Sequence, residues 1–260
     1  MYTGFMEPIS SPYRSSHSGL VAAAAVLGAA LIIGTLVIGF TIYRMRALSN
    51  TVAVTGSAEQ IIDSDIIKWT ANFSRTVSVN GLESGYAGMT RDLAAIKSFL
   101  KDRGVDESQI SVKPSYLNTN YEASEKYGYG SGPISGYTIR QSIAVESPDV
   151  AKITAIAQDA PAALISSGVV LTTENIEYYY SKFADLKVEM LAAATRNAYE
   201  RAAKIVGSTD SKIGALQSSS MGVFQVTSVN STEISDYGYF DTSAIQKKVT
   251  AVVRASFSIK

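Results

Sequence analysis

The sequence contains no cysteine, and its only histidine is His17. The absence of cysteine excludes disulfides, thiolate nucleophiles and cysteine-ligated zinc. Since His17 precedes a long apolar segment, histidine-dependent catalytic triads and HExxH metal sites are excluded as well. The chain also lacks a G-x-S-x-G nucleophile elbow and a G-x-x-x-x-G-K-[ST] phosphate loop. We therefore predict a protein that is not an enzyme, with no catalytic, cofactor-binding or metal-binding residues and no cofactor.

An excess of one charge is missing too, because acidic and basic residues number 23 each. No net electrostatic field would attract nucleic acid, so no nucleic-acid partner is predicted. Two weak polar features remain. Asp63-Ser64-Asp65 could pair as acid and base or bind a cation, although such a turn is more often a hydrogen-bonding bend. The glycines between residues 128 and 136 miss the spacing of a dinucleotide-binding loop.

Residues 20–43 form a long run without a charged side chain, LVAAAAVLGAALIIGTLVIGFTIY. As a helix this run would be about 36 Å long at ~1.5 Å per residue, enough to cross a bilayer core of about 30 Å. A cleaved signal peptide would have a shorter apolar region that ends at a small-x-small site. This run ends instead in Phe40 and Tyr43 and is followed directly by Arg44. We therefore predict an uncleaved signal anchor that crosses the lipid bilayer through residues 20–43, after a disordered flank at 1–19 and before a linker at 44–50.

The remaining residues, 51–260, combine strand-like and helix-like patterns and predict one α+β domain. The clearest helix has apolar residues at spacings of three and four from Leu82 to Leu100, followed by Gly104 as its C-terminal cap. A shorter helix begins at Ser147-Pro148-Asp149 and is predicted to end at Pro161. A third helix, rich in alanine, covers about residues 182–206. Strands are predicted on both sides of the turn within 51–79, and at 110–117, 136–146, 169–178, 213–229 and 247–259.

The order of these elements suggests an internal repeat. Each half of the domain is predicted to be a β-α-β-β unit, with the short middle helix joining the two units. The last two strands of each unit are separated by a loop rich in tyrosine and glycine, YGYGSG at 127–132 and YGYFDT at 237–242. Tyrosine offers a large amphipathic surface at low entropic cost. We therefore regard Tyr127, Tyr129, Tyr237 and Tyr239 as candidate subunit or partner contacts; alternatively, these residues only close over the hairpin ends.

Four segments follow one another along the domain: TVAVTGSAEQIIDSDIIKWTANF, SFLKDRGVDESQISV, GYTIRQSIAVESPDVAKI and AAATRNAYERAAKIVGSTDSKIGALQS. In this order, and covering about residues 51–260, they resemble the SIMPL-domain family. The resemblance implies an α+β fold, export to the bacterial cell envelope, a link to oxidative-stress defence and, for some members, assembly into ring-like homo-oligomers. No catalytic residues are established for that family, so the resemblance implies none here.

The side of the membrane on which the domain lies is indicated in two conflicting ways. Arg44 and Arg46 directly follow the apolar run, whereas Arg14 precedes it, and this bias favours a cytoplasmic domain. The resemblance implies export, and on that basis we predict a single-pass membrane protein with an extracytoplasmic domain. The predicted function is that of a non-enzymatic, membrane-anchored cell-envelope protein, linked to stress defence, that homo-oligomerises into a scaffold or ring-like assembly. The alternative is a ligand- or partner-binding sensor module held at the membrane.

Overall fold

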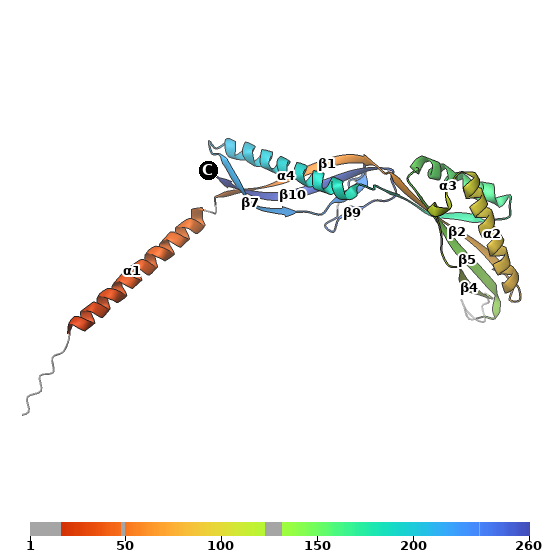
Figure 1. The fold of residues 1–260 in the computed structure, drawn as a ribbon, viewed down its shortest axis with the longest axis horizontal. Coiled ribbons are helices and arrows are strands. Elements are labelled where there is room, and N and C mark those ends of the chain that lie inside the picture. Colours follow the sequence, from red (N-terminus) through yellow and green to blue (C-terminus); the bar gives the residue numbers. More distant parts are fainter. Residues whose placement is uncertain (1–16, 48–49, 123–131, 234) are drawn as a thin grey trace, which may run out of the picture.

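The computed structural model describes residues 17–47, 50–122, 132–233 and 235–260. These residues form an elongated molecule, with a long helix at one end and two αβ lobes beyond it (Figure 1). The proximal lobe, next to the helix, comprises residues 51–63 and 183–260. The distal lobe comprises residues 66–179.

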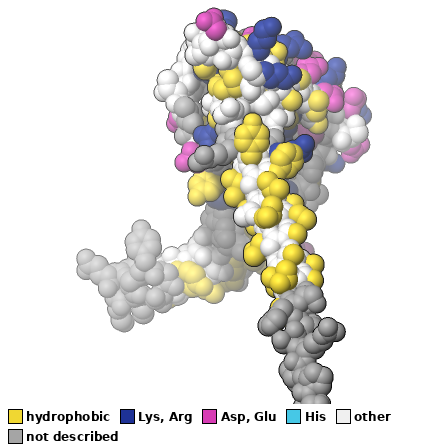
Figure 2. Space-filling model, turned by 90° about the vertical axis from the view of Figure 1, so that its left-hand side faces the viewer, with side chains coloured by type: hydrophobic (Ala, Val, Ile, Leu, Met, Phe, Trp, Pro, Cys, Tyr) yellow, Lys and Arg dark blue, Asp and Glu magenta, His cyan; other side chains and the backbone are white. Residues whose placement is uncertain are grey.

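The helix α1 (His17–Ala47) contains the predicted membrane segment. From Gly19 to Arg44 it is long and apolar enough to cross a bilayer, and its most apolar stretch is not buried against any other described part of the chain. Figure 2 shows this apolar surface extending from a lobe whose own surface carries charges of both signs. The hydroxyls of Thr35 and Thr41 donate to carbonyl oxygens one turn earlier in the helix. These two polar groups are therefore satisfied within α1, as an apolar surrounding requires.

The proximal lobe is a five-stranded sheet covered on one face by one helix. Its strands follow the order β1 (Thr51–Asp63), β10 (Gln246–Ile259), β8 (Gln225–Ser228) and β9 (Tyr239–Phe240), and β7 (Ile213–Met221) also pairs with β10. The strands β1 and β10 are antiparallel over their whole length, from the pair Thr51–Ser258 to the pair Asp63–Gln246. The helix α4 (Phe183–Gly207) packs across these two strands.

Small residues explain how closely α4 lies on the sheet. Ala194, Ala198 and Ala202 are fully buried on the face of α4 that meets the sheet. Opposite them is Gly56 of β1, where an added Cβ would overlap the α4 backbone at the carbonyl oxygen of Ala194. The alanine-rich pattern that predicts close packing is therefore explained by this contact between α4 and β1.

The distal lobe is a second five-stranded sheet, with two helices on one face. Its strands follow the order β3 (Ile110–Val112), β5 (Ile134–Ser147), β2 (Ile66–Val77) and β6 (Leu171–Tyr179), and β4 (Tyr116–Tyr121) also pairs with β5. The covering helices are α2 (Leu82–Asp102) and α3 (Val150–Ile165), and the short 3-10 helix η1 (Glu107–Gln109) precedes β3.

The core of the distal lobe lies between its sheet and the two helices. Trp69 and Phe73 of β2 are buried against the apolar stripe of α2, which includes Ile96 and Leu100. The indole nitrogen of Trp69 donates to the hydroxyl of Thr173 at 3.1 Å, so this large side chain is buried with its polar atom satisfied. The helix stripe predicted from spacings of three and four is confirmed as the core-facing side of α2, except at Tyr86, which is 40% exposed.

The α+β fold class and the N-terminal apolar helix are confirmed, but three predicted elements are wrong. The strand predicted at 110–117 is two strands, β3 and β4, which pair with different parts of β5. Helix α3 passes through Pro161 and ends at Ile165. It continues because Ala160 and Leu164 are buried in the distal core on either side of the proline, and this packing outweighs the lost helical hydrogen bond. The strand predicted at 213–229 is two strands, β7 and β8, which pair with different segments of β10.

The two predicted β-α-β-β units are present, but one is nested inside the other instead of following it. In the distal lobe, β2 pairs with β5 and β5 with β4; in the proximal lobe, β1 pairs with β10 and β10 with β7. The first strand of the proximal unit is thus β1, not the strand after the short middle helix. That strand, β6, pairs with β2, and α3 packs on the distal sheet instead of joining the units. A local pattern predicts a strand but does not show which distant strand it will pair with.

Candidate functional site

The predicted contact residues fall in two loops, of which one is described. Tyr127 and Tyr129 lie outside the described residues. Tyr237 is 97% exposed in the segment between β8 and β10, and Tyr239 is in β9. The pKa of the Tyr239 hydroxyl is raised because this hydroxyl donates a hydrogen bond to the carboxylate of Glu233. The structure thus places Tyr237 and Tyr239 on the surface of the proximal lobe.

An aromatic hollow lies beside these tyrosines, with a volume of about 460 Å³. In it, the rings of Phe183 and Phe240 meet edge to face with their centroids 5.3 Å apart. The ammonium of Lys187 lies 4.7 Å from the centre of the Phe183 ring. Residues 237–240 therefore pack on the first turns of α4, and Tyr237 and Tyr239 line the hollow.

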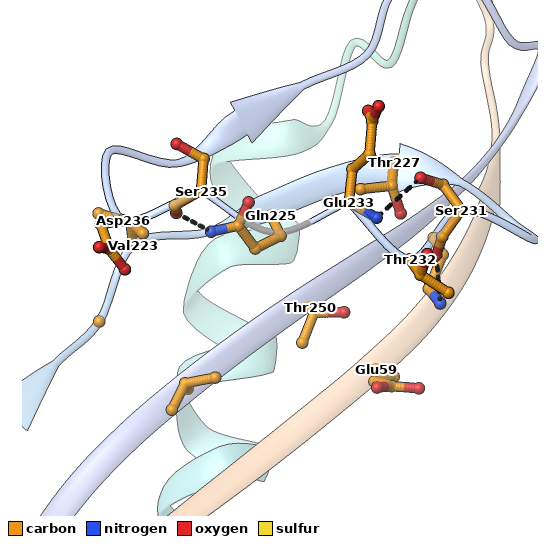
Figure 3. A pocket seen from close by; sticks show the side chains of 13 residues that line it. Glu59, Val223, Gln225, Thr227, Ser231, Thr232, Glu233, Ser235, Asp236 and Thr250 are labelled. Carbon is orange, nitrogen blue, oxygen red and sulfur yellow. Dashed lines mark hydrogen bonds between the residues drawn. The ribbon is translucent and has the colours of Figure 1, made fainter.

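A larger cavity, of about 550 Å³, lies on the face of the proximal sheet that α4 does not cover. We call it the open-face cavity. Its floor is formed by neighbouring strands, with Glu59 of β1 paired to Thr250 of β10 and Thr250 paired to Gln225 of β8. Its wall is the segment after β8, which carries Ser231, Thr232, Glu233, Ser235 and Asp236 across the strands (Figure 3).

Gln225 is the buried polar residue of this cavity, with 8% of its surface exposed. Its side-chain nitrogen donates to the carbonyl oxygen of Ser235 at 2.5 Å (Figure 3). Its side-chain oxygen Oε1 is buried and has no hydrogen-bond partner among the described residues. Lys248 also lines the cavity, and its ammonium lies 3.5 Å from the carbonyl oxygen of Ser231.

A buried lysine at the beginning of β10 has a structural explanation. Lys247 is almost fully buried. Burial lowers its pKa, and the carboxylate of Asp241 opposes that shift. Such a lysine is a candidate catalytic base in principle. Here, however, its ammonium donates to the carbonyl oxygens of Asp241 and Ala244, both at 2.6 Å, and so fixes the segment before β10.

Asp63, Ser64 and Asp65 form the crossing between the two lobes, which agrees with the hydrogen-bonding bend of the sequence analysis. The carboxylate of Asp65 accepts from the amide and the hydroxyl of Ser181, each at 2.6 Å. Burial alone would raise the pKa of Asp65, but these two bonds lower it below its ordinary value. Within the described residues no group of three or more His, Cys, Asp or Glu side chains is placed to hold a metal ion.

The two outer edges of the proximal sheet differ. On β1, the carbonyl oxygen of Thr55 accepts from Arg201 and the amide of Ser57 donates to Asn197, so side chains of α4 cap the middle of this edge. On the other side, β7 pairs only with β10 among the described strands. Its sequence, IGALQSSSM, contains no charged residue and no proline. Native proteins usually use charged residues and prolines to block pairing at an exposed edge.

The comparison with known families identifies the domain. The family model described as "SIMPL: Protein of unknown function (DUF541)" matches residues 52–257. The chain belongs to the SIMPL family. The match runs from β1 to β10, so both lobes are parts of one SIMPL domain. No curated protein matches the chain.

The open-face cavity is the part of this SIMPL domain that the sequence analysis missed. Its polar residues are scattered from Glu59 to Thr250, and they meet only because β1 pairs with β10. The one local signal was the break at Gly222, which lies in the lining of both the cavity and the aromatic hollow. If Gly222 had been interpreted as the end of a strand, the strand predicted at 213–229 would have been divided into β7 and β8.

Proposed function

We propose that this SIMPL protein is a non-enzymatic, membrane-anchored scaffold of the cell envelope that self-assembles through the β7 edge of its proximal lobe. The observation that carries the proposal is the open state of this edge. Leu216 and Met221 of β7 are 47% and 59% exposed, and their strand has an unpaired outer side among the described residues. A second copy of the chain would cover these apolar groups and satisfy the free backbone.

The anchor restricts how the copies are related. The amide of Ile259 donates to the carbonyl oxygen of Asn50, and Ile213 pairs with Ile259. Both β1 and β7 therefore begin next to the membrane helix and run away from it. Two β7 strands paired antiparallel would place their anchors at opposite ends, which a single bilayer does not permit. Copies in one membrane are instead related by rotation about the membrane normal. This rotation gives a dimer if β7 meets β7 of the second copy, and a ring if β7 meets a different surface of it in a head-to-tail contact.

The test is the mass of the full chain in detergent, measured by light scattering, with and without a blocked edge. S218K/S220K places two lysines on β7 and should reduce the mass of a discrete oligomer at least about twofold, because charged edge strands resist pairing. A94K/S98K adds the same charge on the exposed side of α2 and should leave the mass unchanged. A monomeric parent protein, or equal masses for the two variants, would contradict the proposal.

The extracytoplasmic side of the domain is part of the same proposal, and what supports it is the export implied by the family resemblance. Because the chain has no cysteine, one introduced cysteine would be its single thiol for maleimide labelling. A single S98C substitution, on the exposed side of α2, should react with a membrane-impermeant maleimide in right-side-out vesicles. Labelling only after the vesicles are opened would place the domain in the cytoplasm, as the arginines after α1 favour. The link to stress defence rests on the resemblance alone.

A second candidate function is a ligand-binding module held at the membrane. The observation that favours it is the open-face cavity, since binding sites are typically concave and carry a few convergent polar groups. This function and self-assembly use different surfaces of the proximal lobe.

A further inference from the structure

We propose that the open-face cavity binds an organic cation, meaning a ligand with a primary ammonium or guanidinium group on an apolar body. The inference names the ligand class of the second candidate function. It does not require self-assembly, because the cavity is formed within one copy of the chain.

The cavity has the dimensions of a small-molecule site. Its volume of about 550 Å³ lies within the usual range of roughly 300–1,000 Å³ for such sites. The floor of paired strands holds its residues on a rigid support, and residues 231–233 and 235–236 overhang that floor (Figure 3).

The charges of the lining favour a positive ligand. Three acidic residues, Glu59, Glu233 and Asp236, are among the lining residues, and Lys248 is the one basic residue among them. The carboxylate of Glu233 accepts from the hydroxyl of Tyr239 and points away from the floor (Figure 3), which leaves those of Glu59 and Asp236 for a ligand. The ammonium of Lys248 is directed to the backbone oxygen of Ser231. The lining therefore has more negative than positive charge, and a concave surface of one sign attracts ligands of the opposite sign.

The hydrogen-bonding groups point to the same chemistry. Oε1 of the buried Gln225 lacks a donor among the described residues, and a buried acceptor without a partner costs about 1–3 kcal/mol. The amide lines the cavity, so the missing donor would come from there. Carboxylates accept and do not donate. The uncommitted groups of the site are thus mainly acceptors, and ammonium and guanidinium groups are donors only.

The shape of the acceptor set favours an organic cation over a metal ion. No three acidic or histidine side chains in the described parts of the chain converge closely enough to share a metal. Separate carboxylates suit a ligand whose N–H groups reach them individually. An apolar wall for the body of such a ligand is formed by Val223 and Val252, together with Gly222, which lies between β7 and β8.

The experiment is isothermal titration of the full chain in detergent with three probes. Cadaverine represents a free amine, acetyl-arginine amide represents a basic side chain of a partner protein, and 1,5-pentanediol is the neutral analogue of cadaverine. We expect saturable binding of at least one cation, with one site per chain, and no binding of the diol. Binding of the arginine amide alone would identify the source of the cation as a protein side chain.

The variant E59Q/D236N should weaken that binding at least about tenfold, since it replaces two exposed carboxylates of the lining by neutral groups of equal size. E83Q/E107Q removes the same charge from exposed positions of the distal lobe and should bind like the parent protein. An unchanged thermal unfolding midpoint in both variants would exclude loss of the fold. The proposal is overturned if neither cation saturates, if the diol binds equally well, or if E59Q/D236N binds like the parent.

Discussion

The distal and proximal lobes share a strand, helix, strand, strand plan, but they differ in what covers their sheets. Two helices cover the distal sheet, and its core holds the large side chains Trp69 and Phe73. One alanine-faced helix covers the proximal sheet. The other face of that sheet carries the open-face cavity, and its edge strand β7 has a free outer side among the described strands.

This difference indicates a division of roles along the chain. Burial of large apolar side chains is the main source of stability, so the distal lobe is the more strongly stabilised body. The proximal lobe keeps its cavity, its aromatic hollow and its β7 edge accessible next to the anchor. We therefore propose that the same plan is used once for packing and once for contact.

The strongest test of this comparison removes a buried aromatic side chain from each lobe in turn. F73A should lower the free energy of unfolding by about 3–5 kcal/mol, because it leaves a cavity in the distal core. Amide hydrogen exchange should then lose protection in β2, β5 and β6, with β1 and β10 still protected. F257A is the matched change in the proximal core and should show the reverse pattern. Equal loss of protection in both lobes would mean that they unfold as one unit.

The next largest effect concerns the close contact of α4 with β1. G56A should lower the free energy of unfolding by about 1–3 kcal/mol, because its new methyl group would overlap the backbone of α4. G207A is the control, since nothing lies within 4 Å of a Cβ added there. Its effect should stay within about 0.5 kcal/mol. Denaturant unfolding followed by circular dichroism measures both, and similar midpoints for the two variants would disprove the contact argument.

A smaller effect should come from acid at the crossing between the lobes. The pKa of Asp65 is lower in the folded chain than in the unfolded chain, because Ser181 donates to its carboxylate. Its contribution to stability is therefore complete above the unfolded pKa of about 3.9 and is lost as the pH falls through the folded value. D65N should flatten the stability profile below about pH 4. A parallel profile for the parent and D65N would contradict this assignment.

The smallest effect on stability is expected for the tyrosines. Replacing Tyr127, Tyr129, Tyr237 and Tyr239 by serine should change the free energy of unfolding by less than about 0.5 kcal/mol per site at exposed positions such as Tyr237. If these residues contact other subunits, light scattering should show a smaller particle. An unchanged particle size would remove them from the assembly surface and leave β7 as its candidate.

Features with a short sequence period could be predicted, and features that depend on distant pairing could not. The α2 stripe from Leu82 to Leu100 follows the helical repeat, and so its buried side was predictable. The partner of β1 is β10, almost two hundred residues later (51–63 against 246–259). Strand patterns indicate which face is buried but leave the partner open, so the nesting of the two units could not be derived.

The candidate site shows the same limit. Tyr237 and Tyr239 were chosen from composition, and the structure places both on the surface, while their role in contacts stays a prediction. The cavity beside them depends on Glu59, Gln225 and Thr250 lying on three adjacent strands. That adjacency exists only in the folded sheet. Pro161 shows the opposite failure, in which a reliable local rule was overcome by packing on both sides of it.

The nested order of the strands also determines the sequence in which the lobes can form during synthesis. All strands and helices of the distal lobe lie between residues 66 and 179, so this lobe is complete in the nascent chain before α4 has emerged. The proximal sheet must wait for β10, its central strand, while β1 stays unpaired beside the anchor. Until residues 246–259 arrive, the growing chain therefore presents a long, unprotected strand, and a binding factor that shields β1 would protect it from aggregation.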